Sequence, residues 1–468
     1  MMKPSPGRRR CAACREPDKY YFQMTVLLQI LQVFIALSLL IAIHEAGHFI
    51  FARLSGTRVD KFFLFFDAGG IKLFSTKTTG WFTRLFPKMK EAETEYGIGW
   101  LPIGGYCKIN GMIDESFDIE SMRQEPKPWE FRSKPAWQRL LIMLGGVLFN
   151  FIFAIMVYIF IMDKWGQSYI PNSESRIYAS ALAEDLGFRT GDRILDFDGY
   201  IPEDFLNLQS DLARRNVNVT TVLRDNDTVR IYMDRSRIGD IVNTPMMFDL
   251  AFPFIINDIV PESANSGSGL MPGDRIIAID SCRTDYFQDA AEILSNCSGE
   301  TVPVSVLRGR DTLRFNLIIS EDGKIGVSLE SPYRKKEYNF FQAIPAGLKY
   351  SFDTLKGYIQ DLKLVFTPKT GAYKSVGSVI TIVQVFPEKW NWFRFCHLIA
   401  IISIMLGVMN LLPIPGLDGG HAMLLCYEIL TGNKPSDKFL IVAQAIGMVL
   451  LLALMILALG NDIGRLID

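Results

Sequence analysis

The sequence contains only four histidines and seven cysteines, so the candidates for a site built from these residue types are few. The cysteines are too scattered for the disulfide scaffold of a small secreted protein. Cys11 and Cys14 form one CxxC pair, and no second pair follows to complete a structural zinc site. The chain also lacks an excess of either charge, with a formal net charge of −1. Nucleic acid is therefore not an expected partner.

Apolar residues make up 49% of the chain, although charged residues still make up 21%. This combination indicates a polytopic α-helical membrane protein that also has a sizeable water-exposed part. Crossing a bilayer takes roughly 20 mostly apolar residues, and four runs are long enough. We predict four transmembrane helices, over residues 24–50, 137–163, 393–415 and 439–461.

Lysine and arginine gather in the connection 51–136, which predicts that this segment is cytoplasmic. The long segment after the second span then lies on the opposite side of the membrane. Residues 1–23 are also rich in arginine and lysine, and would resist an external N-terminus. Because Met24 opens the hydrophobic run directly, we interpret residues 1–23 as an extension that is not part of the native protein.

Between the second and third spans, GFRTGDRILDFDG (187–199) recurs as GLMPGDRIIAIDS (269–281). In each copy the glycine of GDRI, Gly191 or Gly273, suits a tight turn, and the alternating apolar residues that follow are typical of a half-buried strand. The duplication predicts two homologous α+β modules, over 168–247 and 248–333. The pattern resembles PDZ domains, which can bind a peptide by adding it to a sheet edge; a spacer or steric lid without a ligand is the alternative.

The segment His44-Glu45-Ala46-Gly47-His48 is an HExxH motif at the end of the first span. Residues four apart share a helix face, so both imidazoles can bind one Zn²⁺. Glu45 follows the first histidine, where it can take a proton from an activated water. Ionisable groups within a span are costly and usually functional. The motif therefore predicts a catalytic zinc site, and a helix end with solvated histidines is the alternative.

A catalytic zinc needs a third protein ligand. His397 lies near the outer end of the third span, about a membrane thickness from His48, and is excluded. The sequence NLLPIPGLDGGH (410–421) breaks the helix at its inner end, and broken helices persist in membranes where they line a cavity. Asp418 is therefore the expected third ligand, His421 is its rival, and an ordinary capped loop is the alternative.

Asn150 and Asn410 place amides inside apolar helices, where a buried amide without partners costs roughly 1–3 kcal/mol. Either side chain can donate to a substrate carbonyl or to a developing oxyanion. For Asn150, packing between helices, helped by Gly145 and Gly146, is the alternative.

HEAGH in the first span, GGVLFN (145–150) in the second, NLLPIPGLDGGH in the third and the duplicated module together resemble the site-2 protease family of intramembrane metalloproteases. The bacterial branch, the regulator of sigma-E protease group, is the most similar. The resemblance implies zinc bound by three ligands, a catalytic base and two substrate-positioning asparagines. These are His44, His48 and Asp418 for zinc, Glu45 as the base, and Asn150 and Asn410.

The same resemblance interprets TEYGIGWLPIGGYCKING (94–111) as a membrane-re-entrant β-hairpin within 51–136, whose edge strand would hold an unwound substrate. The segment 334–392 resembles the amphipathic, membrane-associated region before the third span. The family usually has a Gly-Pro dipeptide there, whereas this chain reads KSVGSVITIV (374–383).

The implied function is an intramembrane zinc metalloendopeptidase that cleaves single-span membrane proteins after a site-1-type protease has cut their external domain. An anti-sigma factor and remnant signal peptides are the implied substrates. The implied location is the bacterial inner membrane, with the active site toward the cytoplasm and the PDZ-like modules in the periplasm. The alternative is a catalytically inactive membrane chaperone or scaffold that binds peptides through its PDZ pair. A transporter is disfavoured because the four spans show no inverted repeat.

Overall fold

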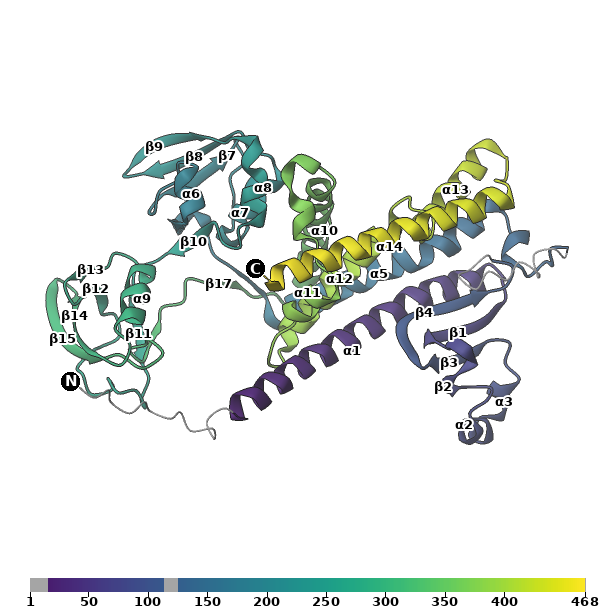
Figure 1. Ribbon diagram of the computed structural model, residues 1–468, viewed down its shortest axis with the longest axis horizontal. Coiled ribbons are helices and arrows are strands. Elements are labelled where there is room, and N and C mark those ends of the chain that lie inside the picture. The colour runs from purple at the N-terminus through teal and green to yellow at the C-terminus, as the bar shows by residue number, and fades with distance from the viewer. Residues whose placement is uncertain (1–15, 113–124, 468) are drawn as a thin grey trace, which may run out of the picture. The chain divides into compact units, whose positions relative to one another are not determined.

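The computed structural model describes residues 16–112 and 125–467, and the chain divides into two compact units (Figure 1). The first unit comprises the chain up to Trp165, then Tyr338–Ile359, and everything from Val376 onward. The second comprises Gly166–Glu337 and Gln360–Ser375. Residues 1–15 of the expected N-terminal extension, with the Cys11 and Cys14 pair, lie outside the described residues.

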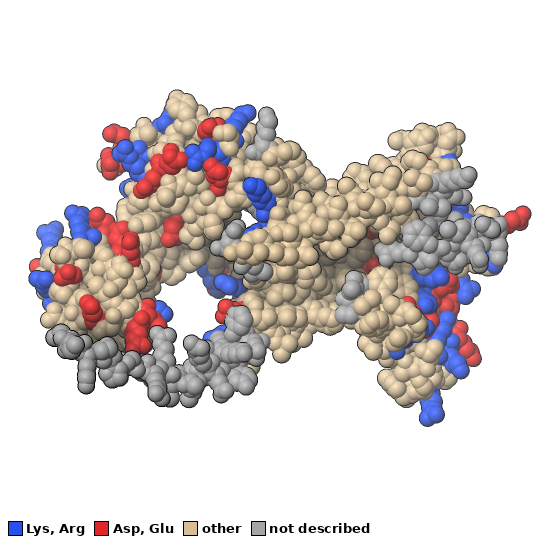
Figure 2. Space-filling view, in the orientation of Figure 1, with Lys and Arg blue, Asp and Glu red and all other residues tan. Residues whose placement is uncertain are grey.

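Four long helices dominate the first unit: α1 (Glu16–Leu54), α5 (Ala136–Trp165), α12 (Trp392–Leu411) and α14 (Asp437–Ile467). Each contains a stretch long and apolar enough to cross a membrane, so the prediction of four such helices is confirmed. Figure 2 shows few charged side chains along these helices. Leu27 and Val449 are examples of large apolar side chains that they leave exposed, as lipid contact requires.

Two helix ends differ from the expected bounds. Helix α1 begins at Glu16, ahead of Met24. Helix α12 ends at Leu411 instead of continuing to residue 415, because Leu412 precedes a proline and is extended there (φ −61°, ψ 141°). The remaining helices of the membrane region are α10 (Phe340–Val365), α11 (Val379–Val385) and α13 (Asp418–Thr431).

A four-stranded sheet follows α1 and has the strand order β2-β3-β1-β4. Its strands are β1 (Val59–Phe66), β2 (Lys72–Ser75), β3 (Glu95–Gly99) and β4 (Leu101–Ile109), with the short helices α2 (Gly80–Leu85) and α3 (Pro87–Lys90) between β2 and β3. Strand β4 lies at one edge of this sheet. The sheet projects sideways from the C-terminal half of α1 (Figure 1).

The expected β-hairpin over 94–111 is wrong in its pairing. Strands β3 and β4 do not pair with each other, because β1 lies between them, parallel to β3 and antiparallel to β4. The chain crosses the end of β1 at Gly99, where a β-carbon would lie 2.2 Å from the carbonyl oxygen of Phe66. The segment is thus two strands held apart by a third, and β4 remains an edge strand.

The second unit contains two modules that share one arrangement. In the first module, β7, β8 and β9 form an antiparallel sheet in that order, and α7 lies between β7 and β8 in the sequence. In the second module, β12, β14 and β15 follow one another in the same way, and α9 takes the place of α7. The elements of the first module are β6 (Arg176–Ala179), α6 (Ala181–Asp185), β7 (Arg193–Phe197), α7 (Leu208–Arg214), β8 (Val219–Arg224), β9 (Asp227–Tyr232), α8 (Ile238–Asn243) and β10 (Phe248–Ala251).

The elements of the second module are β11 (Ile256–Ile259), β12 (Arg275–Ile279), β13 (Cys282–Arg283), α9 (Phe287–Asn296), β14 (Thr301–Arg308), β15 (Asp311–Ile318) and β16 (Val327–Leu329). Strand β5 (Gln167–Tyr169) pairs with β17 (Arg334–Lys336), so the two ends of this insert lie together. Cys282 and Cys297 both lie in the second module and are both free, so they do not form a disulfide.

The expected boundary between the modules, after residue 247, is too early. Strand β10 pairs with β6 of the first module, and Phe248 and Leu250 pack into the first module's core. The core of the second module begins at Phe254. The chain therefore completes the first module at Ala251, and the boundary follows that residue.

The repeated GDRI segment has the same role in both modules. In the first, the Asp192 carboxylate accepts two hydrogen bonds from Arg224, of 2.8 and 2.7 Å. In the second, Asp274 accepts two from Arg308, both of 2.7 Å. Each arginine also donates to the carbonyl of the glycine that opens its repeat. The aspartate of GDRI thus ties the turn to the end of a neighbouring strand.

We expect this carboxylate to make the stability of the second module depend on pH. The hydrogen bonds from Arg308, with a further one from the Met271 N–H, lower the pKa of Asp274. A carboxylate whose pKa is lower in the folded than in the unfolded state stabilises the fold at any pH above its ordinary pKa of about 3.9. This stabilisation is lost as the pH falls from about 3.9 through the lower, folded-state pKa.

We expect Asp274→Asn to raise amide hydrogen exchange in β12 and β14 of the full-length protein at neutral pH, because the Arg308 guanidinium loses its charged partner. The matched control is Asp280→Asn, at an exposed turn position with φ 54° that asparagine also adopts readily. Equal exchange in both variants would contradict a structural role for the pair.

Candidate active site

Helices α1 and α5 make backbone contact through two glycines. A β-carbon on Gly47 would lie 2.2 Å from the Gly145 carbonyl oxygen, and one on Gly145 would lie 2.6 Å from the Gly47 carbonyl oxygen. No other residue type allows this approach, which is typical of small-residue contacts between membrane helices. The HExxH turn of α1 is therefore pressed against α5.

Gly146 provides the space that both imidazoles occupy. A β-carbon there would lie 2.5 Å from His44 Cε1 and 2.6 Å from His48 Nε2. The two histidines are one turn apart on α1, and their rings meet edge to face, with centroids 4.8 Å apart. The glycine pair of GGVLFN thus brings the helices together and leaves room for the rings.

The Nδ1 atoms of both histidines face α5. His48 Nδ1 donates to the Ile142 carbonyl oxygen at 2.9 Å, which leaves Nε2 of that ring without a proton and available to a metal. His44 Nδ1 lies 3.2 Å from Asn150 Nδ2. Both Nε2 atoms lie close to Asp418, the first residue of α13.

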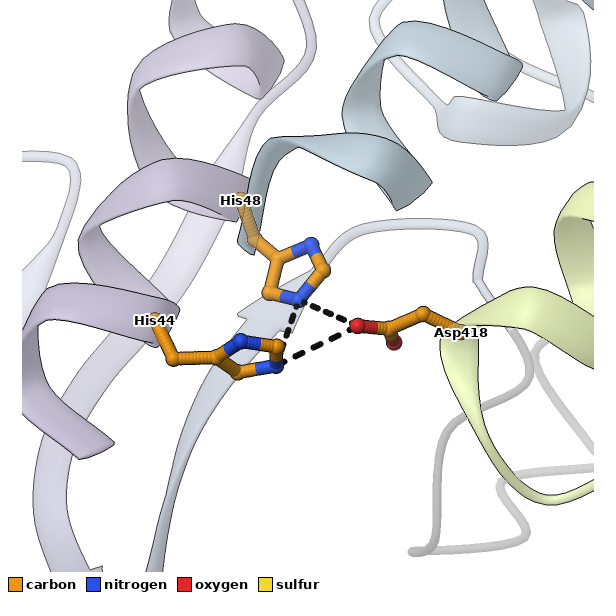
Figure 3. Close-up of side chains that lie close together, drawn as sticks. All are labelled: His44, His48 and Asp418. Carbon is orange, nitrogen blue, oxygen red and sulfur yellow. Dashed lines mark hydrogen bonds and ion pairs between the residues drawn. The ribbon is translucent and has the colours of Figure 1, made fainter. Parts of the chain in front are cut away.

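Asp418 opens α13 and completes the cluster (Figure 3). Its Oδ2 lies 3.2 Å from His44 Nε2 and 3.3 Å from His48 Nε2, and the two Nε2 atoms are 3.2 Å apart. Oδ2 is buried and has no hydrogen-bond donor among the described residues. Three donor atoms that converge in this way could hold a metal ion.

The spacing of the three donor atoms fits zinc. Zinc bonds to imidazole nitrogen and carboxylate oxygen are about 2.0–2.2 Å long, so neighbouring ligand atoms of a tetrahedral site lie about 3.3 Å apart. Two nitrogens and one oxygen leave one of four positions open, which distinguishes a catalytic zinc from a structural one.

The loop before α13 is shaped by glycine and proline. Gly416 has φ +102°, and β-carbons on Gly419 and Gly420 would lie 2.4 Å from the Leu411 carbonyl oxygen and 2.5 Å from the Ile414 carbonyl oxygen. The first turn of α13 therefore folds back against the end of α12. This fold brings Asp418 to the level of the histidines.

A buried ion pair holds α13 against α5. Arg139 Nη2 donates to Glu428 Oε1 at 2.5 Å, and Arg139 Nε donates to the Lys134 carbonyl at 3.0 Å. Both charged side chains are largely buried. Glu428 lies ten residues after Asp418 on the same helix, so the pair fixes the helix that carries the carboxylate.

Asn410 and Asn150 lie on opposite sides of the His44 ring. Asn410 Nδ2 is 3.3 Å from His44 Nε2, the nitrogen that faces Asp418. Asn150 faces the other nitrogen, and its backbone carbonyl accepts a hydrogen bond of 2.8 Å from Ser403 on α12. The two amides have the same role in the sequence-based prediction, whereas in the structure they face different nitrogens of His44.

Glu45 lies on the side of α1 that faces the sheet. A β-carbon on Gly105 of β4 would lie 3.7 Å from Glu45 Cγ and 2.8 Å from Ile41 Cγ2. Glycine at this position lets the edge strand approach α1 closely beside the glutamate. The edge strand β4 therefore lies beside the turn of α1 that carries Glu45 and the two histidines.

The two other histidines lie outside this cluster. His421 lies three residues after Asp418 on α13 and lines a cavity with Arg139 and Glu428. His397 packs with Tyr158 and Tyr350, at ring distances of 5.8 and 6.0 Å. Asp418 is thus the group that converges with His44 and His48, and His421 is not.

Several features of the site were missed from the sequence. The Ile142 carbonyl carries no side-chain pattern, and nothing in the sequence pairs Arg139 with a partner 289 positions away. A pattern that could have pointed to the helix contact is the Gly47 and Gly145-Gly146 set, since small residues mark close contacts between membrane helices.

Comparison with known proteins supports a peptidase. The family model described as peptidase family M50 matches residues 32–454. The chain is 27% identical to Protease RseP of Yersinia pestis and 26% identical to Regulator of sigma-E protease RseP of Escherichia coli (strain K12), over 95% of this chain and 100% of each relative. It is 27% identical to a putative zinc metalloprotease of Borreliella burgdorferi, over 93% of this chain and 98% of that protein.

We expect Asp418→Ala to lower the zinc content of the purified protein well below that of the wild type, because it removes one of three converging donors. His421→Ala is the matched control and is expected to keep its zinc. Metal analysis of both variants in detergent makes the comparison. Full zinc content in Asp418→Ala with loss in His421→Ala would exchange the two assignments.

Proposed function

The chain belongs to peptidase family M50, and we propose that this membrane zinc metalloprotease hydrolyses a peptide bond in the transmembrane segment of single-span proteins. The observation that carries the proposal is the convergence of His44, His48 and Asp418 inside the helical unit, next to Glu45 and an edge strand.

Strand β4 is the proposed binding surface for the substrate. Amides of a transmembrane helix are protected by their own hydrogen bonds, so the segment must unwind before a bond is cut. An extended segment can regain backbone hydrogen bonds by pairing with a free sheet edge. Strand β4 is such an edge, and at Gly105 it lies beside Glu45.

Glu45 is the proposed general base. A zinc ion held by His44, His48 and Asp418 supplies a Lewis acid that polarises the scissile carbonyl and lowers the pKa of a water molecule. Glu45 accepts a proton from the attacking water as its oxygen bonds to the carbonyl carbon, and gives that proton to the leaving amine nitrogen. The bond between the carbonyl carbon and the amine nitrogen breaks, and the products are a carboxylic acid and an amine, which exchange a proton to become a carboxylate and an ammonium group.

Asn410 and Asn150 are proposed to act differently. Asn410, beside the metal-facing nitrogen of His44, can donate its amide N–H to the carbonyl oxygen as negative charge develops there. Asn150 faces the far nitrogen, and its Oδ1 is buried without a hydrogen-bond partner among the residues that the structure describes. A half-turn of the amide places Oδ1 against His44 Nδ1, where it accepts the N–H. Asn150 then orients His44, as the Ile142 carbonyl orients His48.

The two modules of the second unit are proposed to be a tandem PDZ-like pair outside the cytoplasm. Their shared strand order and their matching Asp–Arg pairs support a duplication. The basic connection after α1 supports a cytoplasmic location for the metal end of α1. The modules would exclude proteins with a large external domain, so that a site-1-type protease must act first. The proposed setting is the bacterial inner membrane, with an anti-sigma factor or remnant signal peptides as substrates.

We expect Glu45→Gln to lower cleavage of a single-span reporter in liposomes by about 10²–10⁴-fold, the usual contribution of a general base. Zinc content is expected to stay at the wild-type level, because glutamine removes the base and no proposed ligand. Unchanged cleavage would reject this mechanism, whereas an absence of cleavage in the wild type would favour a peptide-binding scaffold.

Measurements of zinc affinity and of kcat distinguish the proposed roles of the two asparagines. We expect Asn150→Ala to weaken zinc binding by roughly 10–100-fold, as loss of a ligand-orienting group does, and Asn150→Asp to restore it by supplying an acceptor oxygen. Asn410→Ala should keep its zinc affinity and lose about 10²–10³ in kcat. Zinc affinities come from competition with a chelator, and the opposite pattern would exchange the two roles.

A further inference from the structure

The tip of the four-stranded sheet carries an exposed apolar surface. Four aromatic rings, of Phe74, Trp81, Phe82 and Phe86, pack together there, with centroids 5.2 Å apart for Phe74 and Phe82 and 5.0 Å for Phe82 and Phe86. Five large side chains of this region, two of which belong to the ring cluster, are 47–68% exposed. This tip patch consists of Ile71, Leu73, Trp81, Leu85 and Phe86.

The sheet lies beside the membrane-spanning part of α1. The Phe65 ring of β1 is 5.3 Å from Phe34, and the Phe62 ring is 5.6 Å from Phe49. At 1.5 Å of rise per residue, these two contacts are separated by roughly 22 Å along α1. The strands therefore run alongside the helix and do not lie beyond its end.

The tip patch lies near the level at which α1 leaves the membrane. Thr76, just after β2, donates its N–H to the Tyr96 carbonyl, and the Tyr96 ring is 5.9 Å from Phe49. Phe49 is five residues before the end of α1, a rise of roughly 7.5 Å. Helix α2 begins four residues after Thr76, so Trp81, Leu85 and Phe86 of the patch lie near the depth of a membrane–water interface.

Basic side chains accompany the patch. Arg84, Lys88 and Lys90 are exposed, and none has an ion-pair partner within the described parts of the chain. Glu91 is the one acidic residue in 80–91. Figure 2 shows Lys or Arg side chains at the far end of this tip, beside a mostly uncharged surface. Apolar and aromatic side chains next to unpaired cations match the two chemical layers of an anionic bilayer surface.

We propose that the tip patch inserts into the bilayer that holds the four spans, at the interface where α1 ends. Trp81 and the aliphatic side chains contact the upper acyl chains, where tryptophan concentrates in membrane proteins. Arg84, Lys88 and Lys90 contact anionic phospholipid headgroups, which attract basic segments at membrane surfaces. This contact anchors the sheet at the end opposite to β4, and so steadies the edge strand beside Glu45.

The test is the emission of Trp81 in the full-length protein, taken as the difference between the wild type and Trp81→Phe. The protein is placed in nanodiscs of phosphatidylcholine and phosphatidylglycerol whose acyl chains carry bromine near the headgroup. We expect bromolipid to quench this emission and aqueous acrylamide to leave most of it. Quenching by acrylamide without quenching by bromolipid would overturn the proposal and make the patch a surface for a soluble protein.

Three further variants complete the test. Leu85→Trp, with Trp81 retained, is a second reporter on the same patch that does not depend on the folding of Trp81→Phe. Tyr232→Trp, on β9 of the second unit and 76% exposed in the wild type, is the water-exposed control. Combined Arg84→Gln, Lys88→Gln and Lys90→Gln should lose bromolipid quenching in anionic nanodiscs, and unchanged quenching would overturn the headgroup contact.

Discussion

The backbone contact between Gly47 and Gly145 is the constraint on which the rest of the site depends. It brings α1 so close to α5 that successive turns of α5 meet the HExxH turn directly. Ile142, Gly146 and Asn150 are spaced four residues apart and share a face. The first accepts a hydrogen bond from His48, the second leaves room for both rings, and the third faces His44. One turn earlier, Arg139 holds the helix that carries Asp418. A larger residue at Gly145 would therefore disturb all three donor atoms together.

Much of the site follows from the sequence because its parts are local patterns. HExxH fixes two imidazoles on one helix face, and the proline and glycine run after α12 marks where a helix must stop. The depth of these two segments in their spans was enough to favour Asp418 over His397. The choice between Asp418 and His421 needed coordinates, since both residues lie on one short helix and differ by less than one turn.

The parts that could not be predicted depend on contacts between distant segments. Strand β1 comes between β3 and β4, although only Trp100 separates these two strands in the sequence. The first module is completed by β10, which returns to pair with β6 after the chain has left α8. Nor does a sequence show which nitrogen of His44 an asparagine faces, so Asn150 and Asn410 looked alike. In each case the deciding interaction joins residues that no local pattern relates.

The proposed recognition of substrate through the edge of β4 has a consequence for selectivity. A sheet edge binds its partner through backbone hydrogen bonds, and the backbone offers nearly the same donors and acceptors in every sequence. Substrates then differ mainly in the free energy needed to unwind their transmembrane helix. Glycine costs about 1 kcal/mol relative to alanine within a helix, and proline about 3 kcal/mol, so residues of this kind near the cleaved bond would favour the extended form. On this basis the enzyme would select substrates by their local helix propensity more than by the identity of any one side chain.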